Sequence, residues 1–149
     1  MIRELTITRV LDAPRDLVFQ AWLDPKRIAQ WWGPKGFTNV VREWDARPGG
    51  AIDLDMIAPD GGGHPMGGAF REVTPPSRLV FTSTAFEDAN GEPGLENLNT
   101  VTFSEEGNKT VMTLHVVVLR ANERAAEGLA GMEQGWNQTL DRLGDLVTA

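Results

Sequence analysis

Several residue types are missing or scarce in this sequence, and each absence removes a class of function. The 149 residues contain no cysteine, which excludes disulfides, thiolate metal sites and cysteine nucleophiles. There is no tyrosine, so few hydroxyl groups are present to orient a substrate, and the only histidines are His64 and His115. No apolar run approaches the length of a membrane span, so we expect no membrane partner.

Basic residues are also scarce relative to acidic ones. Fourteen Lys and Arg against 21 Asp and Glu give a formal net charge of −7, which argues against nucleic acid or anionic lipid as a partner. A hydrophobic content of 41% is typical of a soluble globular protein, and the length fits a single domain at 1–149. The first four residues show no signal-peptide pattern, so we expect a cytoplasmic protein.

The last thirty residues, 120–149, predict a long amphipathic helix that Asn122 can cap. Gly128, Gly131 and Gly135 form a line on this helix, although each should cost about 1 kcal/mol relative to alanine. The glycine line indicates that the helix passes close to another element or leaves room for a cavity. The alternative is a helix of low intrinsic propensity that is stabilised by its packing against the rest of the protein. The apolar stripe beside the glycines consists of Ala125, Leu129, Met132, Trp136, Leu140, Leu143 and Val147.

Most of the preceding chain predicts strands separated by turn residues. Two short helices, at 14–22 and 24–31, follow the first strand, and Asp24 suits the N-cap of the second. Gly67 and Gly68 predict a bulge or strong bend in the fourth strand. The expected strands are 3–11, 38–44, 51–57, 64–73, 78–84, 98–104 and 110–119.

These elements predict an α+β fold. Consecutive strands joined by tight turns form an antiparallel sheet in which one face is exposed to solvent and the other, dry face packs on the core. Only one long helix is present to cover the dry face. We therefore expect a curved seven-stranded antiparallel sheet around a long C-terminal helix, with two short helices after the first strand. Such a sheet leaves an internal cavity unless large side chains fill it.

A set of short motifs resembles one protein family. The motifs are Trp31-Trp32-Gly33-Pro34, Pro48-Gly49-Gly50, Gly68-Ala69-Phe70-Arg71-Glu72-Val73, Pro75-Pro76-Ser77-Arg78-Leu79-Val80-Phe81-Thr82, Thr102-Phe103-Ser104-Glu105, Gly135-Trp136 and Leu140-Asp141-Arg142-Leu143. They resemble the stand-alone bacterial domain homologous to the C-terminal part of the Hsp90 ATPase activator. That family belongs to the START/Bet v 1-like superfamily, which includes polyketide cyclases and aromatases. The resemblance covers essentially the whole chain and implies a helix-grip fold. It implies much less about function, because most such members have no established ligand or reaction.

Large apolar side chains are candidates to line the cavity. Trp31 and Trp32 stand in a loop just before Gly33-Pro34, an unusual position for residues that only fill a core, and they could face Phe86 across the cavity mouth. Core packing is the alternative for most of the set. The candidates are Trp31, Trp32, Leu54, Met56, Phe70, Phe81, Phe86, Val101, Phe103, Leu114, Met132 and Trp136.

Three polar residues, Arg71, Glu72 and His115, are candidates to anchor a ligand. An inward Glu72 would have a raised pKa and could act as a general base, although an ion pair with Arg78 across the hairpin is the simpler interpretation. His115 alternates with apolar neighbours, so it points to the outer face unless the strand register shifts by one residue.

Asp53 and Asp55 point the same way from one strand and could make an acidic metal site with Glu43 or Asp45. Such faces are more often simply solvated. We expect no metal and no cofactor. No catalytic residue is assigned, because the serines show no Ser-His-Asp signature.

The favoured function is binding of a small apolar or aromatic molecule in the cavity. One alternative is a cyclase- or aromatase-type enzyme that uses the same cavity and needs an inward polar pair. The other is a module that presents the outer face of the sheet to a chaperone. It is disfavoured, because in the eukaryotic activators the Hsp90 contact also depends on a separate N-terminal domain, for which this chain has no room. The identity of the ligand, any reaction and homo-oligomer formation are left open.

Overall fold

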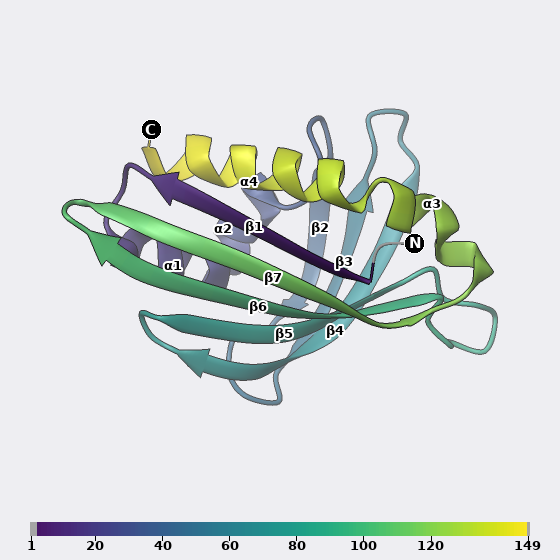
Figure 1. Ribbon diagram of the computed structural model, residues 1–149. Helices are drawn as coiled ribbons and strands as arrows, with labels where there is room; N and C mark the ends of the chain where they lie inside the picture. The colour runs from purple at the N-terminus through teal and green to yellow at the C-terminus, as the bar shows by residue number, and fades with distance from the viewer. Residues whose placement is uncertain (1–2, 149) are drawn as a thin grey trace.

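A computed structural model describes residues 3–148 and shows one seven-stranded antiparallel sheet with the strand order β1-β7-β6-β5-β4-β3-β2 (Figure 1). The predicted strands are confirmed, and only their ends move: β6 begins at Leu95 and β7 continues to Ala121. The strands are β1 (Glu4–Leu11), β2 (Thr38–Trp44), β3 (Ala51–Ile57), β4 (Gly63–Thr74), β5 (Arg78–Ala85), β6 (Leu95–Glu106) and β7 (Lys109–Ala121).

Two short helices carry the chain from β1, at one edge of the sheet, to β2 at the other edge. They are α1 (Arg15–Leu23) and α2 (Pro25–Trp31). The Asp24 carboxylate accepts a hydrogen bond of 2.9 Å from the backbone amide of Lys26, which confirms Asp24 as the N-cap of α2. Trp22, at the end of α1, is completely buried.

The C-terminal segment differs from the single helix that the sequence predicts. Asn122 does cap its start, since its side chain accepts a hydrogen bond from the amide of Arg124. The helix is then interrupted at Gly131, where φ is −96° and ψ is 2°. Glycine gives the least helix support of any non-proline residue, so an interruption is least costly there. The segment consists of η1 (Glu123–Ala125), α3 (Ala126–Ala130) and α4 (Met132–Thr148).

The helix α4 lies along one side of the curved sheet, and α3 lies at the end of the molecule where the β5–β6 loop projects (Figure 1). Polar contacts hold α4 beside the β1 edge. The Arg9 guanidinium donates hydrogen bonds of 2.7 Å to Asp141 and 2.9 Å to the side chain of Asn137. Among residues 3–148, no helix is both long and apolar enough to span a membrane.

A cluster of aromatic side chains fills the core between α1, α2 and the sheet. The Trp22 ring meets Trp31 edge-to-face at 4.7 Å and stacks on Trp136 at 6.5 Å between ring centroids. The buried Trp31 indole donates a hydrogen bond of 2.9 Å to the backbone of Ala21, and the Trp44 indole donates one of 2.8 Å to the backbone of Trp22. These bonds tie α1 to α2 and to β2.

Of the bulge or strong bend that the sequence predicts in β4, the bulge lies elsewhere along the strand. The pairing register shifts between Phe70 and Glu72, rather than at Gly67 and Gly68. Gly68 is required for a different reason: its φ is 151°, and a Cβ there would lie 1.9 Å from the carbonyl oxygen of Thr82 on β5. The glycine thus permits the close approach of the two strands.

Candidate ligand-binding cavity

A cavity of about 270 Å³ lies between the sheet, the loop after α2 and the C-terminal helices. Each of these elements supplies part of the wall, and the ends of β3, β4, β5 and β6 form its floor. The lining residues are Trp32, Gly33, Pro34, Met56, Met66, Ser83, Thr84, Ala85, Phe86, Leu95, Asn97, Gly128, Gly131, Met132, Gly135, Trp136 and Thr139.

The wall is dominated by aromatic and thioether side chains. Trp32 and Trp136 meet edge-to-face at 5.5 Å between ring centroids and form one continuous aromatic surface. Met56, Met66 and Met132 add flexible side chains that can adapt to the shape of a ligand. Among the described residues that line the cavity, none carries a charge. The cavity therefore suits an uncharged, largely apolar occupant.

Gly128, Gly131 and Gly135, the three glycines that form a line in the C-terminal segment, all line the cavity. At Gly135, a Cβ would meet only Pro34 within 4 Å, and at Gly131 its nearest neighbour would be 3.6 Å away. These two glycines leave space. Gly128 is different, because a Cβ there would lie 2.7 Å from the Phe86 ring. The close approach that the sequence suggests is therefore found at Gly128 alone.

A few polar side chains interrupt the apolar wall. Asn97, on β6, is 7% exposed and lies opposite Ser83 of β5 in the strand register. Its buried Oδ1 accepts no hydrogen bond from any residue that the structure describes. Thr139, on α4, uses its hydroxyl within its own helix, where it donates a hydrogen bond of 2.8 Å to the backbone of Gly135. Asn97 is therefore part of the lining, and its Oδ1 is buried without a partner among the described residues.

Arg142 of α4 fixes the loop that brings Trp32 to the cavity. One guanidinium nitrogen, Nη1, donates hydrogen bonds of 2.9, 3.0 and 3.0 Å to the backbone carbonyls of Trp32, Gly33 and Pro34. The other, Nη2, donates one of 2.8 Å to the carbonyl of Gln30. Burial lowers the pKa of Arg142 from its usual value. A cation at this position satisfies the carbonyls at the C-terminal end of α2 that have no partner within the helix.

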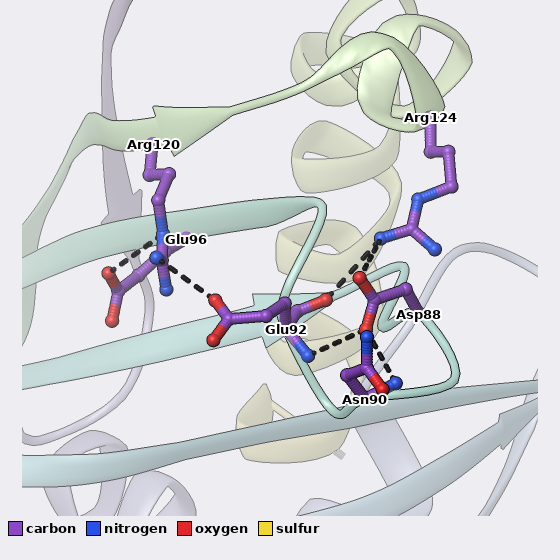
Figure 2. A network of polar contacts seen from close by, with 6 residues as sticks. All are labelled: Asp88, Asn90, Glu92, Glu96, Arg120 and Arg124. Atoms are coloured by element: carbon purple, nitrogen blue, oxygen red, sulfur yellow. Dashed lines mark hydrogen bonds and ion pairs between the residues drawn. The ribbon is translucent and has the colours of Figure 1, made fainter.

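The loop between β5 and β6 begins with Phe86 at the cavity wall, and polar contacts hold its outer part (Figure 2). The Asp88 carboxylate accepts hydrogen bonds of 2.8 and 3.0 Å from the backbone amides of Asn90 and Glu92. These bonds, with a smaller contribution from Arg124, hold the pKa of Asp88 below its usual range. The Arg124 guanidinium lies 3.9 Å from Asp88, so the loop is also connected to η1.

The structure divides the predicted cavity residues between the cavity and the core. Five of them lie in the cavity wall: Trp32, Met56, Phe86, Met132 and Trp136. The other seven are buried in the core and do not line it: Trp31, Leu54, Phe70, Phe81, Val101, Phe103 and Leu114. The division follows the aromatic cluster around Trp22, which fills one end of the space under the sheet and leaves the other end open.

The three predicted polar anchors lie outside the cavity wall. Arg71 is exposed, and Glu72 accepts a hydrogen bond of 3.2 Å from Arg78 in the predicted ion pair. His115 interacts with the Glu4 carboxylate on the outer face, as the strand alternation predicts. The sequence analysis missed the polar residues that do line the cavity, namely Ser83, Thr84, Asn97 and Thr139. Asn97 falls in a segment expected to be a loop.

The carboxylates of Asp53 and Asp55 both form ion pairs with Arg42. The Arg42 guanidinium donates hydrogen bonds of 2.7 Å to Asp53 and 2.8 Å to Asp55 and lowers the pKa of both carboxyls. Within residues 3–148, no group of three or more histidine or acidic side chains is placed to hold a metal ion. The positive charge of Arg42, a residue of the same sheet, thus compensates part of the negative charge of this surface pair.

Comparisons with known proteins agree with this architecture. A family model described as Activator of Hsp90 ATPase homolog 1-like protein matches residues 12–148. The crystal structure of a Chromobacterium violaceum protein is similar over 100% of this chain and 99% of its own, with 30% identity and a TM-score of 0.83. Among curated proteins, none matches this sequence.

Two more distant structures support the fold alone. The solution structure of an Arthrobacter aurescens protein has a TM-score of 0.86 and 24% identity, over 97% of this chain and 86% of its own. The crystal structure of the AHSA1 protein from Silicibacter pomeroyi has a TM-score of 0.78 and 22% identity, over 97% of each chain. The helix-grip fold that the sequence motifs imply is thereby confirmed.

Proposed function

The chain belongs to the family of Activator of Hsp90 ATPase homolog 1-like proteins, and we propose that this member binds a small, uncharged, largely apolar molecule in its cavity. The observation that carries the proposal is a wall of aromatic and methionine side chains without a charged residue. Ligand sites are typically concave and mostly apolar, with a few polar groups that fix orientation. A volume of about 270 Å³ is at the small end for such sites and suits a molecule of about one or two rings.

The glycine at position 135 supports the presence of a ligand in the cavity. Glycine inside a helix costs about 1 kcal/mol relative to alanine. At Gly135 a Cβ would have its nearest neighbour 3.9 Å away, so a methyl group there would fit without strain. Alanine would therefore be more stable at this position if stability alone mattered. A glycine at this position is explained if a ligand occupies the space that a side chain would otherwise fill.

The two alternative functions find less support. An enzyme of the cyclase type needs an acid or base at the cavity, and the described lining residues include no carboxylate and no histidine. A chaperone-binding face would expose a contiguous apolar patch. The most exposed large apolar residues on the strands are instead scattered: Val10 lies on one edge strand, Val40 on the opposite one, and Leu119 near the end of β7.

A cavity-filling substitution tests the proposal with indene, an apolar molecule of two fused rings, as the probe. Gly135→Leu places an aliphatic side chain into the cavity beside Pro34. We expect the affinity for indene, measured by titration calorimetry, to fall at least about tenfold. The free energy of unfolding should stay constant or rise by up to about 1 kcal/mol, because leucine is the better helix former.

Gly144→Ala on the same helix is the control. A Cβ at Gly144 would meet Leu11 at an ordinary 3.6 Å, and this glycine does not line the cavity. The control should gain similar helix propensity and bind indene as the wild type does. Failure of the wild-type protein to bind indene, or unchanged binding by Gly135→Leu, would contradict the proposed function.

A further inference from the structure

The hairpin of β3 and β4 brings three soft metal ligands to one face of the sheet (Figure 1). In its antiparallel register, Met56 of β3 lies directly opposite His64 of β4, and Met66 follows His64 by two residues on the same strand. Residues that are paired across two strands share a face of the sheet, and so do residues two apart along one strand. Met56 and Met66 both line the cavity, so His64 belongs to the same inward face, next to the β3–β4 loop.

The spacing of these three side chains allows them to converge on one ion. Directly paired residues have Cβ atoms about 5 Å apart, and diagonal neighbours such as Met56 and Met66 lie about 7–8 Å apart, a separation that long side chains can span. A methionine has three rotatable side-chain bonds, so its thioether can be repositioned without a change in the backbone. Met56 is half-buried and His64 is exposed, so both side chains have room to adjust.

An aromatic ring lies beside the same group of side chains. The rings of Phe37 and His64 are 5.9 Å apart between centroids. Phe37 and Met56 both approach Gly33: a Cβ at this glycine would lie 3.3 Å from Cβ of Phe37 and 3.6 Å from Sδ of Met56. The Met56 thioether and the His64 imidazole therefore both lie near Phe37. An aromatic face beside a cation attracts it through the quadrupole of the ring.

We propose that Met56, His64 and Met66 form a binding site for a soft monovalent cation, Cu(I). Thioethers are soft ligands of the kind that favour Cu(I), and imidazole also binds copper. Three coordinate bonds compensate the loss of water around the ion, and the net charge of −7 attracts cations to the protein. The proposal departs from the sequence-based expectation that no metal binds. It does not depend on the proposed function, since the site needs no apolar ligand.

The other soft ligands of the described chain lie away from this hairpin. His115 interacts with Glu4 on the outer face of the sheet. Met112 is completely buried in the core, and Met132 lines the cavity from α4. The sequence contains no cysteine, so thiolates cannot account for Cu(I) binding. Binding of one Cu(I) by the untagged protein can therefore be assigned to particular side chains by single substitutions.

Competition with bicinchoninate, a chelator that forms a coloured complex with Cu(I), measures the affinity under anaerobic conditions. We expect the wild-type protein to withdraw one equivalent of Cu(I) from the complex. Met56→Leu and Met66→Leu keep the approximate side-chain volume and remove one thioether each, so both variants should fold normally. Each of them, and His64→Gln, should lower the affinity at least about tenfold, because even residues that only support a metal ligand typically contribute that much.

Met132→Leu is the matched control, because it removes a thioether from the same cavity but from α4 rather than the hairpin. Its affinity for Cu(I) should equal that of the wild type. NMR of protein labelled at the methionine methyl carbons gives a second readout, with Ag(I) as a soft monovalent probe that air does not oxidise. Ag(I) should shift the methyl signals of Met56 and Met66 and leave those of Met112 and Met132 in place.

The outcomes separate this site from the proposed function. Failure to withdraw Cu(I) from bicinchoninate, or equal affinities in the wild type and the three hairpin variants, would overturn the metal site. A loss in Met132→Leu as large as that in Met56→Leu would overturn its assignment to the hairpin. Wild-type protein that binds indene but not Cu(I) would retain the proposed function and reject the metal site, whereas the reverse result would support the metal site alone.

Discussion

The aromatic ring of Phe86 lies against Gly128 of α3, at a position where no side chain could be added without displacing it. A Cβ at Gly128 would lie 2.7 Å from Cε2 of Phe86. Phe86 itself has a φ of 58°, a left-handed conformation that non-glycine residues rarely adopt. Its side chain is 38% exposed although it lines the cavity, so the ring forms the part of the wall that reaches solvent. Both residues line the cavity, so this contact lies at the solvent-facing end of its wall.

Gly128→Ala should therefore open this end. The added methyl group displaces the Phe86 ring, which has solvent beside it and can rotate outward. We expect indene to dissociate several-fold faster, as measured by NMR line shapes, because the ring no longer covers the cavity. The free energy of unfolding should change by less than about 1 kcal/mol, since the gain in helix propensity offsets the lost contact. Gly131→Ala, with no neighbour closer than 3.6 Å, is the control and should leave the dissociation rate unchanged. Equal rates in Gly128→Ala and the wild type would show that Phe86 does not control access.

Much of the fold could be predicted, because strand alternation and helix caps are local signals. Asp24 and Asn122 both cap helices as their side-chain chemistry indicates. The interruption at Gly131 could not be predicted, since the apolar stripe continues at helical spacing on both sides of it. Periodicity records which face a residue occupies and carries no information on whether the backbone stays continuous.

The sequence indicates which strand residues point inward, but it does not indicate which of these line the cavity. Leu54 and Met56 share one face of β3, yet only Met56 lines the cavity. The same division separates Phe81 from Ser83 on β5. Alternation gives the face of a strand, whereas the position along the strand at which the core ends depends on the aromatic cluster packed above it. Asn97 was missed because β6 begins three residues earlier than its apolar pattern indicates.

The guanidinium of Arg142 connects α4 to the Trp32 loop, and its removal should be costly. Arg142→Met keeps the aliphatic stem and leaves the carbonyls of Trp32, Gly33 and Pro34 without this donor. We expect the free energy of unfolding in urea to fall by about 2–4 kcal/mol, since hydrogen bonds to charged groups contribute more than neutral ones.

Arg142→Lys should lie between the wild type and Arg142→Met, because an ammonium group cannot reproduce the planar fork of donors. Arg124→Met is the surface control, since the Arg124 guanidinium is 3.9 Å from Asp88 and such pairs contribute little to stability. A loss below about 0.5 kcal/mol in Arg142→Met would mean that water replaces the guanidinium at these carbonyls without consequence.

The order of the β5–β6 loop should depend on the ionisation of Asp88. Its pKa is lowered mainly by the backbone amides of Glu92 and Asn90, so the carboxylate binds the folded loop better than the neutral acid does. The contribution is complete above the ordinary pKa of about 4 and is lost as the pH falls through the lower pKa of the folded state. The Asp88 carboxyl carbon should accordingly titrate below pH 4 by NMR. In Asp88→Ala, the Asn90 and Glu92 amides should exchange with solvent faster even at pH 7.

Asp60→Ala provides the matched control for this effect. Asp60 makes the same kind of turn, in which its carboxylate accepts a hydrogen bond of 2.8 Å from the amide of Gly62, but in the β3–β4 loop. Its substitution should accelerate exchange at Gly62 and leave Asn90 and Glu92 unaffected. Because Phe86 precedes the Asp88 turn, indene should also dissociate faster from Asp88→Ala than from Asp60→Ala. Wild-type exchange rates at Asn90 and Glu92 in Asp88→Ala would show that the loop is ordered by its other contacts, such as the ion pair of Arg120 with Glu92 at 3.5 Å.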